Sequence, residues 1–135
     1  MNPPLEKLRL AAIVIGWAAL VVIMLATLSP IDERPHIPGF SPNAERFLSY
    51  FAAGALLSFA YPRKRWLVLG GIVALAGGLE WLQTLESSRH GVPVDALVKC
   101  GGALLGGALA GLLDRMAVRL RGPARPQQPR WPGST

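Results

Sequence analysis

The segment Leu10–Leu28, LAAIVIGWAALVVIMLATL, decides the fold class because its 19 residues include no charged side chain. A helix of that length extends about 28 Å, which matches the hydrocarbon thickness of a bilayer. Lys7 and Arg9 precede the segment. A cleaved signal peptide is the alternative, but its apolar region would cover only about 7–15 residues. The segment therefore predicts a retained transmembrane helix at about residues 8–28.

The composition of the whole chain also indicates a membrane protein. Of its 135 residues, 51% are hydrophobic and 16% are charged, whereas a soluble domain carries about 25% charged residues. The net charge is +6, but the basic residues flank apolar segments and form no aromatic-basic groove, so nucleic acid is not an expected partner. Cys100 lies in an apolar run with no metal-ligand spacing around it, and we expect a small buried residue there.

Three further helices are expected along the chain. Ser41 and Pro42 form an N-cap followed by a first-turn proline, which predicts a helix at about 42–61 that Pro62 ends. A third helix at about 66–85 begins at Trp66, a residue typical of membrane interfaces.

A fourth helix is expected at about 93–113, with Asp114 marking its exit. The sequence therefore predicts an all-α fold, a four-helix transmembrane bundle that forms one domain over residues 1–118. Residues 119–135 are rich in proline and arginine and show no apolar period, so they predict a disordered basic tail.

The distribution of lysine and arginine predicts the orientation of the bundle. Three basic residues, Arg34, Arg46 and Arg89, fall on one side, and Lys99 lies within a helix. The other ten fall on the opposite side: Lys7, Arg9, Arg63, Lys64, Arg65, Arg115, Arg119, Arg121, Arg125 and Arg130. By the positive-inside rule both termini are cytoplasmic, and the loops at 31–41 and 86–93 face outward. We expect a multi-pass protein of the bacterial inner membrane.

Polar residues inside the predicted spans all fall in the outer half of the bilayer, where they are costly. Glu80 and Gln83 are three residues apart and share a helix face. Asp95 and Lys99 are four residues apart and can pair directly. If the helices turn these faces toward one another, they form a single outward-opening ligand-binding cluster of Arg46, Tyr50, Glu80, Gln83, Asp95 and Lys99, which Arg89 in the adjoining loop can cover.

Simpler roles stay open for several of these residues. Asp95 can merely complement the positive end of its helix, Lys99 can extend to the interface, and Glu80 can be an interfacial carboxylate. Four glycines on the polar faces are expected to serve helix packing, namely Gly54, Gly77, Gly102 and Gly106. Residues 63–65 are expected to be topology signals that also contact anionic lipids. His36 and His90 lie in separate loops, and neither a metal nor a cofactor is expected.

The stretch Glu80-Trp81-Leu82-Gln83, followed by Arg89, Asp95, Gly102 and Gly106, resembles the VanZ-like family. That family carries Glu-x-x-Gln near the end of its third helix, a loop arginine, and Asp-x-x-x-Asn-x-x-Gly-x-x-x-Gly opening its fourth. Its second helix often begins Asp-Lys-x-x-His-Phe-x-x-Tyr, of which this chain keeps Phe47 and Tyr50. The resemblance covers about residues 25–113.

The chain departs from the family pattern at positions that matter for chemistry. Pro42, Asn43 and Arg46 stand where the family has aspartate, lysine and histidine, and Lys99 stands where it has asparagine. If the aspartate, lysine and histidine of the family transfer protons, this chain lacks the side chains for that chemistry. The family takes its name from a member linked to teicoplanin resistance, which implies a role at the outer surface with cell-wall or lipid-linked molecules.

Three functions are compatible with these features. The first is a non-catalytic envelope accessory protein whose outer cluster binds or shields a head group, a cell-wall precursor or a partner protein. The second is an intramembrane enzyme that acts on a lipid-linked or glycan substrate with Glu80 or Asp95 as general base. The third is a small transporter. Four helices would require a homo-oligomer for this role, and no predicted helix is broken at mid-membrane, as transporter helices often are. Membrane lipids are expected partners in each case.

Overall fold

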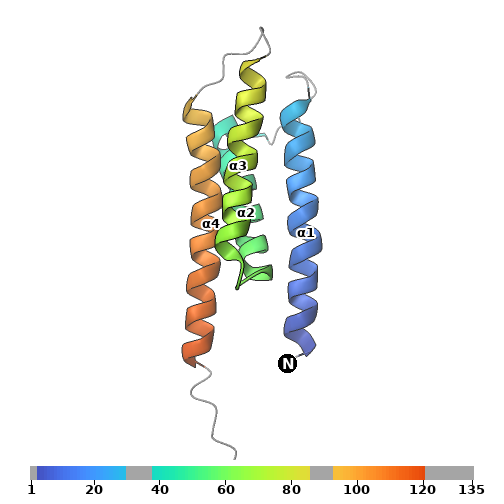
Figure 1. Ribbon diagram of the computed structural model, residues 1–135, viewed down its shortest axis with the longest axis vertical. Coiled ribbons are helices and arrows are strands. Elements are labelled where there is room, and N and C mark those ends of the chain that lie inside the picture. The colour runs from blue at the N-terminus through green and yellow to red at the C-terminus, as the bar shows by residue number, and fades with distance from the viewer. Residues whose placement is uncertain (1–2, 30–37, 86–92, 121–135) are drawn as a thin grey trace, which may run out of the picture.

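The computed structural model describes residues 3–29, 38–85 and 93–120 (Figure 1). They form four helices, α1 (Pro3–Leu28), α2 (Pro42–Ala60), α3 (Arg65–Thr84) and α4 (Pro93–Leu120), and the described ranges contain no strand. The all-α prediction is therefore confirmed. Figure 1 shows that successive helices run in opposite directions. The start of α1 and the end of α4 consequently lie at the same end of the bundle.

Two helix boundaries differ from the sequence prediction. α1 begins at Pro3 rather than near residue 8, because proline fits the first turn and good helix formers follow it. α4 continues to Leu120 instead of ending near residue 113. Asp114 does not end it, since the first glycine or proline after this point is Gly122. The predicted tail at 119–135 therefore starts too early, and residues 121–135 lie outside the described ranges.

The second helix begins as predicted. Ser41 has extended backbone angles, and its hydroxyl accepts a hydrogen bond from the amide of Ala44 at 3.3 Å. Pro42 occupies the first turn, where its missing N–H has no consequence. At the other end, the amide of Tyr61 donates to the carbonyl of Leu57, and Pro62 comes directly after it.

Three of the helices, α1, α3 and α4, are long and apolar enough to cross a membrane, when the described residues are searched. α2 is not among them, because its 19 residues include Asn43, Glu45 and Arg46 near the start. The structure thus supports a membrane protein with three candidate spans rather than the four predicted.

α2 is nevertheless the central helix of the bundle. It contacts each of the other three helices and contributes three residues, Tyr50, Ala53 and Leu57, to the principal buried cluster. The remaining members of that cluster come from the other helices, namely Leu20, Ile72, Ala76 and Ala103. Most side chains of α1 that face away from α2 are large, apolar and exposed, as expected of a surface in contact with lipid.

The most extensive packing joins α2 to α4, along a stripe of small residues on α4. Its buried positions after Lys99 recur every three or four residues and are all glycine or alanine: Gly102, Ala103, Gly106, Gly107, Ala110 and Gly111. Small residues let two helix backbones approach closely, which is the usual basis of helix association in membranes.

Candidate functional site

Four charged side chains form a continuous chain of ion pairs at one end of the bundle, which we call the charge network. Arg46 Nη1 lies 2.5 Å from Asp95 Oδ1, and Asp95 Oδ2 lies 3.2 Å from Lys99 Nζ. Lys99 Nζ also lies 2.7 Å from Glu80 Oε2. The charges alternate in sign along the chain, so each carboxylate is next to a cation.

The antiparallel order of the helices brings these residues together. Arg46 lies near the start of α2, Asp95 and Lys99 lie in the first two turns of α4, and Glu80 lies in the last turns of α3. The starts of α2 and α4 and the end of α3 are at the same end of the bundle (Figure 1). The network therefore joins three helices that are distant in sequence.

Burial increases along the network from Arg46 to Lys99. The Arg46 side chain is 34% exposed, those of Asp95 and Glu80 are 12% and 11% exposed, and that of Lys99 is 3% exposed. A buried ion pair adds little net stability, but removing one partner leaves an uncompensated charge that costs about 3–5 kcal/mol. A ligand would therefore first contact the network at Arg46, its most exposed side chain, whereas Lys99 is its most buried one.

Tyr50 lies beside the network on α2, one turn after Arg46. Its side chain is only 1% exposed, and its ring packs in the principal buried cluster. The phenol interacts electrostatically with Asp95, Glu80 and Cys100. Within the described ranges its buried hydroxyl has no hydrogen-bond partner. A buried hydroxyl without a partner is unfavourable, and this one leaves an unused donor beside the network.

Three of the four predicted packing glycines lie where the backbones of α2 and α4 meet. A Cβ atom on Gly54 would collide with the carbonyl of Ala103, and one on Gly102 or Gly106 would collide with the carbonyl of Phe47 or Phe51. These glycines bring α4 close enough to α2 for Asp95 to reach Arg46.

The fourth glycine, Gly77, does not lie at a helix contact within the described residues of the single chain. Gly77 is exposed, and nothing lies within 4 Å of a Cβ built on it. The inward face of α3 instead follows Leu69, Ile72, Ala76 and Leu79, which places Gly77 on the opposite side of Glu80 from Ala76. Within the single chain, Gly77 packs against no other helix.

Among the remaining predicted site residues, the structure describes Gln83, which lies outside the network. Gln83 Nε2 donates a 3.0 Å hydrogen bond to the carbonyl of Thr27, which ties the end of α3 to the end of α1. Arg89, predicted to cover the cluster, lies outside the described residues. Of the seven predicted ligand contacts, the structure therefore joins Arg46, Asp95, Lys99 and Glu80 directly and places Tyr50 beside them.

A second ion pair at the opposite end of the bundle was missed by sequence analysis. Arg65 Nη2 lies 2.5 Å from Asp114 Oδ2, and the guanidinium lies against Gly111. Arg65 was interpreted only as part of a basic loop and Asp114 only as a helix exit. The order of the helices could have indicated this pair, because the start of α3 and the last turns of α4 lie at the same end when the two helices are antiparallel.

The described residues contain no group of three or more histidine, cysteine, aspartate or glutamate side chains placed to hold a metal ion. Cys100 is partly buried beside the principal cluster. The described residues at the charge-network end supply paired charges and a phenol.

Comparisons with protein-family models, with curated proteins and with solved structures find no match for this chain. The resemblance to the VanZ-like family therefore depends on the motif residues quoted from the sequence.

Proposed function

We propose that this protein is a non-catalytic accessory protein of the bacterial inner membrane, whose charge network binds the phosphate-bearing head group of a membrane lipid or lipid-linked envelope precursor. In this proposal all four helices cross the bilayer, both termini are cytoplasmic, and the network lies at the outer face. The proposal includes VanZ-like membership, which the spacing of Glu80, Gln83, Asp95, Gly102 and Gly106 supports.

Packing rather than hydropathy supports α2 as the fourth span. Its 19 residues extend about 28 Å, close to the hydrocarbon thickness. Its most polar residue within the bundle, Arg46, is paired with Asp95, which lowers the cost of a charge near the membrane. The other three helices cover much of α2, so lipid contacts less of its surface.

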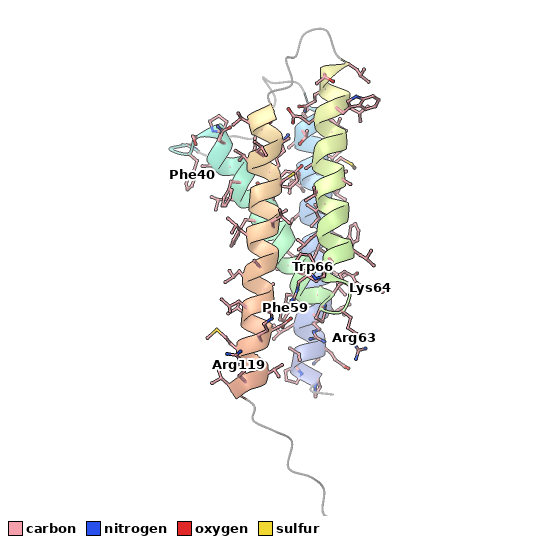
Figure 2. All side chains as sticks on the ribbon, turned by 60° about the vertical axis from the view of Figure 1, so that its left-hand side comes forward. Phe40, Phe59, Arg63, Lys64, Trp66 and Arg119 are labelled. Atoms are coloured by element: carbon pink, nitrogen blue, oxygen red, sulfur yellow. The ribbon has the colours of Figure 1, made fainter. Side chains whose placement is uncertain are left out.

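The positive-inside rule supports the orientation. Figure 2 shows Arg63, Lys64 and Arg119 toward the end of the bundle that lies away from Phe40. Phe40 lies just before the start of α2, where the charge network begins. If the basic end is cytoplasmic, the network faces outward.

The binding proposal depends on the N–H groups of Arg46 that no described residue engages and on the partial exposure of its side chain. Only its Nη1 atom is engaged within the described ranges, by Asp95 and by the Asn43 side chain at 3.3 Å. The remaining N–H groups form one side of a planar fork, the geometry that binds phosphate through two parallel hydrogen bonds. The side chain is 34% exposed and lies in the first turns of α2, so a ligand at this end of the bundle can contact it. The Tyr50 hydroxyl, which has no hydrogen-bond partner among the described residues, adds a donor deeper in the site.

The enzymatic alternative assigns Glu80 or Asp95 as a general base. Both oxygens of Asp95 are in contact with cations, and Glu80 accepts a hydrogen bond from Lys99. Protonation of either carboxylate would remove the negative charge that its cation partner faces, and an uncompensated charge in a buried pair is unfavourable. The geometry therefore favours binding over proton transfer.

The test is lipid binding by the full-length chain purified in a mild detergent. Native mass spectrometry would count bound short-chain phospholipid for the unaltered protein, for Arg46→Gln, and for the control Arg119→Gln, which removes an exposed charge at the opposite end. We expect saturable binding that Arg46→Gln weakens by about tenfold or more and Arg119→Gln leaves unchanged. Equal binding by all three proteins would overturn the proposal.

A further inference from the structure

Among the described residues, acidic side chains outnumber basic ones at the end of the bundle that holds the charge network. Within the described ranges it carries three acidic side chains, Glu45, Glu80 and Asp95, against two basic ones, Arg46 and Lys99. The opposite end carries only two acidic side chains, Glu6 and Asp114, against a larger basic set of Lys7, Arg9, Arg63, Lys64, Arg65, Arg115 and Arg119. Electrostatics alone would therefore direct a purely anionic head group to the opposite end.

Donors and acceptors are separated within the network. The unengaged N–H groups of Arg46 lie at the accessible end, and they can only donate. Farther in, the Oε1 atom of Glu80 accepts no hydrogen bond from any described residue. Asp95 accepts one contact on each oxygen, and each carboxylate oxygen has capacity for a second. The site therefore offers a cationic fork for a phosphate and, a few atoms away, carboxylate acceptors for an amine.

We propose that the network selects a zwitterionic head group of the phosphoethanolamine type over an anionic one. This inference rests on the proposed function, because it names the class of head group bound at that same site. The phosphate oxygens accept hydrogen bonds from Arg46, and the primary ammonium donates to Asp95 and to Oε1 of Glu80. A neutral ligand of this kind adds no net charge to the network, whose two cations and two carboxylates balance, whereas a phosphoglycerol head group adds a negative charge.

The experiment compares three short-chain lipids on the unaltered, full-length protein in detergent: dihexanoylphosphatidylethanolamine, its N-acetylated derivative, and dihexanoylphosphatidylglycerol. N-acetylation keeps the phosphate and removes the ammonium charge, so the first two probes form a matched pair. Because no substitution is involved, the comparison does not depend on how a variant folds. We expect the ethanolamine lipid to bind about tenfold more tightly than either of the other two.

Two results would overturn this inference, and they separate it from the proposed function. Equal affinity for all three lipids, or tighter binding of the glycerol lipid, together with a loss in Arg46→Gln, would exclude selection of a zwitterion and leave head-group binding in place. Absence of saturable binding by every probe, or affinities that Arg46→Gln does not change, would overturn both.

Discussion

Lys99 Nζ lies 2.7 Å from Glu80 Oε2 although the two residues are 19 positions apart, and the lysine side chain is almost completely buried. The pair joins the end of α3 to the start of α4. It also connects through Asp95 to Arg46 on α2, so that one buried cation is linked to charged side chains on three helices.

Replacing Lys99 with methionine should destabilise the bundle. Lys99→Met leaves Glu80 without its cation, and we expect a loss of about 3–5 kcal/mol in the free energy of unfolding. The double variant Lys99→Met/Glu80→Gln removes both charges and should recover most of that loss. Tryptophan fluorescence during titration of the detergent-solubilised protein with dodecyl sulfate would measure the free energy of unfolding of the single and the double variant. A double variant no more stable than the single one would show that the pair is not the source of the effect.

Exchanging the charges of Asp95 and Lys99 should not restore stability, although the two residues are four apart on one helix. The exchange Asp95→Lys/Lys99→Asp keeps their mutual attraction but places a lysine beside Arg46 and an aspartate beside Glu80. Two new like-charge contacts result, as many as in each single charge reversal, so we expect the double variant to be no more stable than either single variant. The same unfolding titration measures this, and rescue by the exchange would mean that Asp95 and Lys99 form an isolated pair.

The glycines should divide into two classes on substitution by alanine. Gly106→Ala forces its new methyl group against the backbone of Phe51, and we expect a loss of about 1–3 kcal/mol. Gly77→Ala meets open space and should be neutral or stabilising by up to about 1 kcal/mol through helix propensity. Thermal unfolding in detergent compares the two. A similar loss in both would show that Gly77 is packed against a neighbour, such as a second copy of the chain.

Removing the ion pair at the opposite end should have a smaller effect. Arg65→Gln loses the contact with Asp114, both side chains of which remain partly exposed, and we expect a loss of about 1 kcal/mol. Arg63→Gln is the matched control, because Arg63 is an exposed arginine two positions before Arg65 in the same basic turn. Equal stability of the two variants would indicate that the Arg65–Asp114 contact contributes nothing measurable.

Much of this fold can be predicted from short-range signals in the sequence. The charge-free segment Leu10–Leu28 is enough to predict α1, and Ser41 and Pro42 determine where α2 begins. The spacing of Gly102 and Gly106 predicts a close helix contact, although it does not say with which helix. Each of these features acts within about one turn of its own position and is therefore readable from a single chain.

Relative helix rotation is not determined by the sequence pattern. Gly77 and Ala76 flank Glu80 on opposite sides of α3, and only packing against α2 and α4 decides that Ala76 faces inward. The contact between Lys99 and Glu80 depends on the same rotation. The end of a helix likewise depends on the residues beyond it. Asp114 illustrates this, because one charged residue does not stop a helix that has no glycine or proline before Gly122.

The most direct test of the proposed function is the side of the membrane on which each end of the bundle lies. In a Cys100→Ala background, Ser41→Cys places a thiol at the exposed start of α2, and Lys64→Cys places one in the exposed basic turn before α3. A membrane-impermeant maleimide applied to cells with a permeable outer layer should label the first position and leave the second unlabelled until the inner membrane is opened. Labelling of the second position alone, or of both, would contradict a charge network at the outer face.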